Sequence, residues 1–99
     1  MKGKRITVIA KMKAKRGMED KLKSELLNLV VPSRLDDGCI NYDLYQATVD
    51  KSVFIFHENW NSKENLDKHL QTPHLKSFAA KADTMLAEPP EGTLHEMIS

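Results

Sequence analysis

The chain has 99 residues, 40% of them hydrophobic, and a formal net charge of +1. This length suits one domain covering residues 1–99, and the near-neutral charge argues neither for nor against a nucleic-acid partner. No apolar run is long enough to cross a membrane. The single cysteine, Cys39, excludes an intrachain disulfide framework, and no signal peptide is evident, so we expect a cytoplasmic protein.

The first two predicted elements are a strand and a helix. Residues 6–14 alternate between apolar and polar side chains, which predicts a strand with one buried face, and Gly17 breaks the alternation. Helical spacing predicts a helix over the apolar residues Met18, Leu22, Leu26, Leu29 and Val30. Because Pro32 has no backbone donor, we expect it to end or kink this helix near Val31.

A β-hairpin is predicted next. Alternation returns in residues 39–48 and again in residues 53–60, and a short polar turn separates the two runs. The second run places Phe54, Phe56, Glu58 and Trp60 on one strand face.

The remaining chain predicts a second helical stretch in two parts and a last strand. Ser62 suits a helix N-cap, while Thr72 and Pro73 suit the cap and first residue of a restarted helix. Residues 88–92 contain two prolines and a glycine that end the stretch, and a short strand is predicted at 93–98.

The resulting order, β-α-β-β-α-β, predicts an α+β, ferredoxin-like fold, an antiparallel sheet with its helices on one face. The opposite face would carry Ile9, Val53 and Ile55, which are too apolar to remain in water. A second copy of the sheet is the simplest cover, so we expect a homodimer.

Two residues near the end of the third predicted strand are candidate site residues. Trp60 is the only tryptophan, and at a strand-to-helix corner its ring could wall a cavity or simply fill the core. Glu58 shares a face with Phe54, Phe56 and Trp60, where an unpaired charge is costly. We expect Glu58 to be paired with a Lys or His, or to have a raised pKa and move protons.

Two histidines follow on the helical stretch. His69 lies on an apolar stripe with Leu66 and Leu70, as a core histidine or as a base facing a pocket. His74 lies in the first turn after Pro73, where the helix dipole favours a neutral ring that accepts a hydrogen bond. A solvated surface histidine is the alternative for His74.

Other chemistries fit the sequence less well. His69 and His74 are five residues apart across a helix break, unlike a pair on one helical face, so no metal site is predicted. Cys39 has no motif partner and is expected to be structural. Residues 51–56 loosely resemble an aromatic RNA-binding strand, but residues 6–12 lack the second aromatic that such a protein needs, so no nucleic-acid partner is predicted.

Several segments resemble the antibiotic biosynthesis monooxygenase (ABM) family, and most closely its quinol-monooxygenase-like branch. They are ENWNSKENL at residues 58–66, HLQTPHLKSF at 69–78, DGCINY at 37–42 and AEPP at 87–90. The resemblance runs from about residue 6 to residue 98.

This resemblance implies a dimeric α+β barrel with a pocket between helices and sheet, lined by Trp60, His69 and Phe78. It implies a monooxygenase that oxidises a quinol or polyphenol-type small aromatic with molecular oxygen and uses no metal, flavin or haem. His69 or His74 would be the base, with Trp60 and Glu58 beside it. The residues expected to bind the substrate are Phe56, His74, Phe78 and Tyr42.

Haem degradation, isomerisation and non-catalytic binding are the alternatives to this activity on the same scaffold. The haem-degrading branch needs an asparagine and a histidine at positions that fall near Ala10 and Ala79, so haem is not expected. The Thr-Pro-His segment at residues 72–74 also resembles an isomerase of a small oxygenated metabolite. A non-catalytic small-molecule-binding stress protein on the same scaffold is a third alternative.

Overall fold

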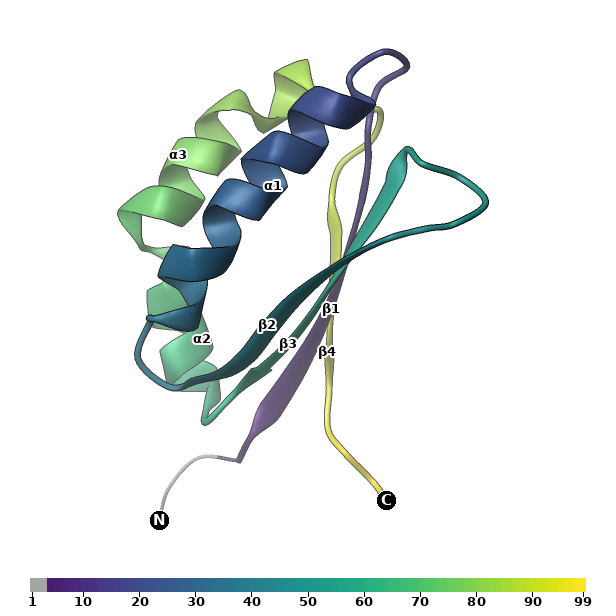
Figure 1. Ribbon diagram of the computed structural model, residues 1–99. Helices are drawn as coiled ribbons and strands as arrows, with labels where there is room; N and C mark the ends of the chain where they lie inside the picture. The colour runs from purple at the N-terminus through teal and green to yellow at the C-terminus, as the bar shows by residue number, and fades with distance from the viewer. Residues whose placement is uncertain (1–3) are drawn as a thin grey trace.

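The computed structural model describes residues 4–99 and confirms the predicted α+β, ferredoxin-like order (Figure 1). The strands are β1 (Ile6–Lys13), β2 (Cys39–Gln46), β3 (Val53–Trp60) and β4 (Glu91–His95). The helices are α1 (Glu19–Arg34), α2 (Lys63–Leu70) and α3 (Pro73–Lys81), followed by the 3-10 turn Ala82–Thr84. None of the described helices is both long and apolar enough to span a bilayer.

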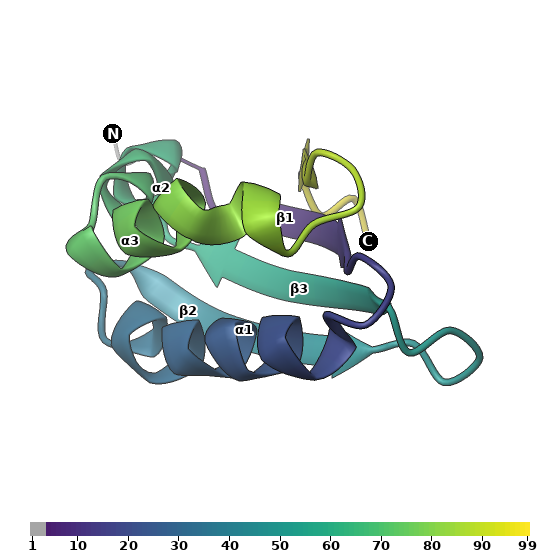
Figure 2. The same cartoon turned by 90° about the horizontal axis from the view of Figure 1, so that it is seen from above.

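The strands form one sheet in the order β2-β3-β1-β4, with every neighbouring pair antiparallel. All three helices lie on one side of the sheet, where α1 packs against β2 and α3 packs against α1 (Figure 2). The register places Val8 and Tyr42 on either side of Glu58, on the face under the helices. A carboxyl group therefore lies in the middle of the covered sheet face.

The hydrophobic core lies between this face and the helices. Alternation on β3 buries Phe54, Phe56 and Trp60, and the stripe on α1 buries Leu22 and Leu26. These are the residues that the two periodicities select, because side chains alternate along a strand and recur every three to four positions along a helix. The core keeps water away from any polar group on the same face.

Of the two expectations for Pro32, an end of α1 near Val31 is wrong, because the helix continues through Pro32 to Arg34, and a kink there stays a prediction. The φ angle of proline is compatible with a helix, and near the C-terminus only one backbone bond is lost. Leu35 and Asp36 then donate their backbone N–H groups to the carbonyls of Pro32 and Ser33, which closes the last turn. The extra turn delivers Asp36 to the end of the sheet where α2 begins.

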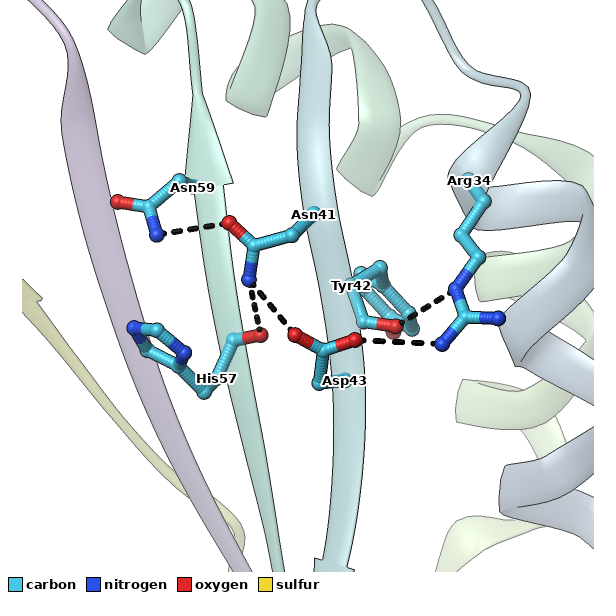
Figure 3. Close-up of polar contacts among 6 residues, drawn as sticks. All are labelled: Arg34, Asn41, Tyr42, Asp43, His57 and Asn59. Atoms are coloured by element: carbon cyan, nitrogen blue, oxygen red, sulfur yellow. Dashed lines mark hydrogen bonds and ion pairs between the residues drawn. The ribbon is translucent and has the colours of Figure 1, made fainter.

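The opposite sheet face carries both apolar and polar side chains. Figure 3 shows a row of amide and charged groups on it, in which Asn59 donates to Asn41 at 2.8 Å and Asn41 donates to Asp43 at 3.1 Å. Arg34 extends the row by donating to Asp43 at 3.2 Å and to the backbone oxygen of Tyr42 at 3.1 Å. Ile9, Val53 and Ile55 are only partly buried on this face.

The turn before β2 depends on Gly38. Its φ angle is +77°, and a Cβ at this position would overlap the side chain of Asn65. Gly17 has a φ angle of +88° but has open space where a Cβ would lie, so it shares the backbone strain without the overlap.

We expect Gly38→Ala to lower the free energy of unfolding by about 2–4 kcal/mol, the sum of a left-handed backbone cost and an overpacking cost. Gly17→Ala is the matched control and should cost about 1–2 kcal/mol. Urea denaturation of both variants measures the difference. Equal losses would show that Asn65 does not restrict this position.

Candidate functional site

A cavity of about 230 Å³ lies between the sheet and the helices. Apolar side chains and one glycine make up most of its lining: Val8, Ala10, Met12, Leu29, Phe56, Leu66, Leu70, Leu75, Gly92 and Leu94. Three polar side chains also line it, and they are Tyr42, Glu58 and His69. Leu70 and Leu94 are each 49% exposed, so the cavity reaches the surface on their side. It is an apolar chamber with a few converging polar groups, the usual composition of a small-molecule site.

Glu58 enters this cavity from β3, two residues before the strand ends at Trp60, and is 5% exposed. Its Oε1 accepts a hydrogen bond of 3.0 Å from Trp60 Nε1, and no ion pair to it occurs within residues 4–99. Burial raises the pKa of Glu58 from its ordinary value of 4.5 to about 7, although the Trp60 bond opposes the rise. Of the expectations for Glu58, the raised pKa is confirmed, no Lys or His among residues 4–99 pairs with it, and a role in moving protons stays a prediction.

His69 reaches the cavity because α2 begins where it does. The Ser62 side chain accepts the backbone N–H of Asn65, and this cap fixes a helical phase that buries Leu66 and His69 together. The imidazole packs against Trp60 with ring centroids 4.4 Å apart, and against Tyr42 at 5.3 Å. Trp60 is therefore a support behind the histidine.

Asp36 is the site residue that the sequence did not single out. Its Oδ2 lies 2.8 Å from His69 Nδ1, in the loop that follows α1. A carboxylate beside Nδ1 favours the tautomer that carries its proton there, which leaves Nε2 as an acceptor for the cavity. Desolvation lowers the pKa of His69, and the hydrogen bond to Asp36 opposes this only in part. A neutral imidazole is thereby oriented toward the cavity.

His74 binds the same oxygen of Asp36 from the other side, with Nε2 at 2.9 Å. A nitrogen facing a carboxylate oxygen donates, so the expected acceptor role of His74 can apply only to its other ring nitrogen, Nδ1, and stays a prediction. The argument that a helix break separates His69 from His74 is also wrong. The turn before Pro73 directs both rings to one side, with centroids 6.1 Å apart.

The remaining predicted site residues divide into two groups. Tyr42 and Phe56 line the cavity, and their rings are 4.7 Å apart. Burial raises the pKa of Tyr42 well above its ordinary value. Trp60 and Phe78 are buried in the core and lie outside the lining, so only His69 of the three residues expected to line the pocket does so.

A family model described as "Antibiotic biosynthesis monooxygenase" matches residues 5–81. The chain belongs to this family. The motif-based resemblance in residues 58–66 and 69–78 is thus confirmed, and these segments contribute three of the residues around Asp36 and the cavity: Glu58, His69 and His74.

This ABM protein has relatives of similar sequence, and solved structures share its fold. It is 30% identical over 92 residues to the uncharacterized protein sll1783 of Synechocystis, covering 93% of this chain and 63% of that protein's length. It is 30% identical over 84 residues to Rv0793 of Mycobacterium tuberculosis, provisionally named a monooxygenase, covering 85% of this chain and 82% of that one. The crystal structure of PA3566 from Pseudomonas aeruginosa superposes with a TM-score of 0.93 at 29% identity, covering 100% and 99% of the two chains.

The buried Glu58 makes stability depend on pH. A folded-state pKa above the ordinary value means that the folded protein binds this proton more tightly than the unfolded chain. Its contribution is therefore full below about pH 4.5 and declines as pH rises to about 7, by no more than about 3 kcal/mol. We expect Glu58→Gln, which cannot ionise, to become more stable relative to the wild type between pH 5 and pH 8. Urea denaturation at both pH values measures this change.

Glu25 offers a control, because its pKa is shifted in the opposite direction to that of Glu58. It is a surface carboxylate 2.8 Å from Lys81 Nζ, and this hydrogen bond lowers its pKa. Glu25→Gln should therefore show no relative gain at the higher pH. An equal gain in both variants would contradict the assignment of the effect to burial of Glu58.

Proposed function

We propose that this protein is a cofactor-independent monooxygenase that oxidises a quinol or polyphenol-type small aromatic with molecular oxygen. The observation that carries the proposal is an apolar cavity that holds a neutral, oriented imidazole and a carboxyl group with a pKa of about 7. Membership of the ABM family, whose name describes monooxygenases, supports the reaction class. The quinol or polyphenol substrate is what the resemblance to the quinol-monooxygenase-like branch implies, and the cavity is compatible with it.

The size and walls of the cavity support a small aromatic substrate. Its volume of about 230 Å³ lies below the roughly 300 Å³ that begins the range for drug-sized ligands. Phe56 and Tyr42 offer aromatic surfaces, while Leu66 and Leu75 offer aliphatic ones. The three polar side chains can bind hydroxyl groups at the edge of a ring.

The first chemical step would be loss of a phenolic proton to Nε2 of His69. Asp36 would stabilise the imidazolium that forms, because its carboxylate already contacts Nδ1 at 2.8 Å. The resulting quinolate anion is electron-rich and passes an electron to oxygen in a space lined mostly by apolar side chains. The overall reaction balances without a reductant, since a quinol and one O₂ give a hydroxyquinone and one water.

Glu58 would act on the other side of the substrate's aromatic ring. With a pKa of about 7 it is present in both protonation states near neutral pH, so it can donate to or accept from a substrate oxygen. Trp60 positions this carboxyl through its 3.0 Å hydrogen bond without touching the cavity. His74 is also off the cavity, and it holds Asp36 in place through the second hydrogen bond.

His69 and Glu58 together also favour a second candidate function, an isomerase. A base and an acid on one cavity can move a proton between two carbons or oxygens of a small oxygenated metabolite, and such an isomerisation consumes no oxygen. Turnover under anaerobic conditions would separate the isomerase from the monooxygenase. Thermal stabilisation by a ligand that is not converted would instead indicate a non-catalytic binding or stress protein.

We also propose that two copies pair through the sheet face opposite the helices. This face exposes parts of Ile9, Val53 and Ile55, and Tyr45 on the same face is 56% exposed. Apolar surface of this kind is stabilised by contact with a matching surface, and a twofold dimer provides one. The polar row around Asn41 would supply hydrogen bonds that fix the register of such a pair.

Oxygen uptake with a panel of quinols tests the proposed activity, with enzyme-free samples to subtract autoxidation. We expect turnover with one ¹⁸O atom from ¹⁸O₂ in the product, and a loss of about 10²–10⁴-fold in kcat/KM for His69→Gln, which lacks the base. His95→Gln, at an exposed position on β4, is the matched control and should keep full activity. Uptake equal to the enzyme-free rate, or an unchanged His69→Gln, would contradict the proposal.

Light scattering after size exclusion tests the proposed dimer. We expect the wild type to elute with twice the chain mass, and Ile9→Glu to raise the dimer dissociation constant at least about tenfold by placing a charge in the contact. Val49→Glu is the control, because Val49 is 97% exposed in the turn between β2 and β3, away from the sheet face. A monomeric wild type at high concentration would be inconsistent with the pairing.

A further inference from the structure

We infer that Asp36, His69 and His74 form a binding site for one divalent transition-metal ion of the Zn²⁺ class. The three ligand atoms are Asp36 Oδ2, His69 Nδ1 and His74 Nε2, and all lie within 4.8 Å of one another. They come from three separate segments, namely the loop after α1, the end of α2 and the first turn of α3. The inference rests on this geometry and does not depend on the proposed function.

The chemistry of the ligand set selects the kind of ion. Two imidazole nitrogens and one carboxylate oxygen suit zinc, iron, nickel, cobalt or copper, whereas calcium and magnesium prefer oxygen ligands alone. Metal–nitrogen and metal–oxygen bonds of about 2.0–2.2 Å around one ion place ligand atoms about 3–3.5 Å apart. The present separations from Asp36 Oδ2, 2.8 Å and 2.9 Å, are slightly shorter, and the two ring nitrogens lie within 4.8 Å of each other. Rotation of the three side chains would therefore be needed to admit the ion.

The surroundings of the three side chains also suit an ion. Tight packing against Trp60 and Tyr42 holds the His69 ring, so one ligand is already ordered. Asp36 and His69 border a groove of about 230 Å³ that also includes Asn65 and Thr72, which provides an entry path and room for water ligands. The second oxygen of Asp36 is free to complete a bidentate contact, since no hydrogen bond to it occurs in residues 4–99.

Metal binding would change the cavity through the tautomer of His69. In the hydrogen-bonded state Nδ1 carries the proton and faces Asp36. A metal on Nδ1 requires that nitrogen to be unprotonated, so the proton moves to Nε2, which is the edge available to the cavity. The same ring would then present a donor where it had presented an acceptor, so the base of the proposed function would act only in the metal-free protein. This switch provides a spectroscopic signature of binding at this site.

Calorimetric titration with Zn²⁺ alone tests the site. We expect one ion per chain in the wild type, and binding at least about tenfold weaker in His74→Gln, since loss of even an outer partner costs about 10–100-fold. The glutamine amide can still donate to Asp36, so the fold has its hydrogen bond while the imidazole ligand is gone. His95→Gln, which removes a histidine elsewhere, is the matched control and should bind as the wild type does.

Nitrogen NMR of the histidine rings gives the second measurement. We expect Zn²⁺ to move the His69 proton from Nδ1 to Nε2 in the wild type and to leave His57 and His95 unchanged. Absence of saturable binding, equal weakening in His74→Gln and His95→Gln, or binding with no change at His69 would each overturn the inference. In that case the three side chains form a hydrogen-bonded array only, and the proposed role of His69 as a base is untouched.

Discussion

One carboxylate oxygen, Oδ2 of Asp36, joins three parts of the chain. Its partners His69 and His74 lie 33 and 38 positions after Asp36 in the sequence. It holds the loop after α1 against the end of α2 through His69 and against the start of α3 through His74. Hydrogen bonds to a carboxylate are about twice as strong as neutral ones, and low local dielectric strengthens them further. The orientation of the His69 ring, and with it the chemistry available to the cavity, depends on this contact.

Burial of the helix-covered sheet face is the second constraint. It favours the uncharged form of Glu58, Tyr42 and His69. Burial raises the pKa values of Glu58 and Tyr42 and lowers that of His69, so the neutral form of each group is favoured. The cavity is therefore low in charge while it keeps donors and acceptors. Such a space suits chemistry in which charge develops on a bound molecule and the protein supplies fixed dipoles. Trp60 contributes from behind the cavity wall, by bonding Glu58 and packing against His69.

Much of this arrangement could be predicted from residue patterns. The period of two in β3 correctly placed Glu58 on the buried face with Phe54, Phe56 and Trp60, and the spacing in α2 correctly buried His69. Other details were beyond local patterns. Pro32 was expected to end or kink α1, but the helix continues to Arg34 and buries Ser33 in its last turn. Trp60 was expected to line the pocket, but its ring packs against the ring of His69 instead. A strand pattern predicts which face a side chain lies on, but not how the side chain is directed at the end of the strand.

By itself, the sequence determined the element order, the buried face of each strand and the segments that identify the family. These are local properties, set by the alternation of side chains along a strand and their recurrence around a helix. Only the tertiary structure decided that Asp36 meets His69 and His74, and that a helix break brings the two histidines together. That convergence depends on where α1 ends and on how the turn before Pro73 directs α3. The end of α1 and the direction of α3 are set by packing between segments distant in sequence, and this packing produces no periodic pattern in the sequence.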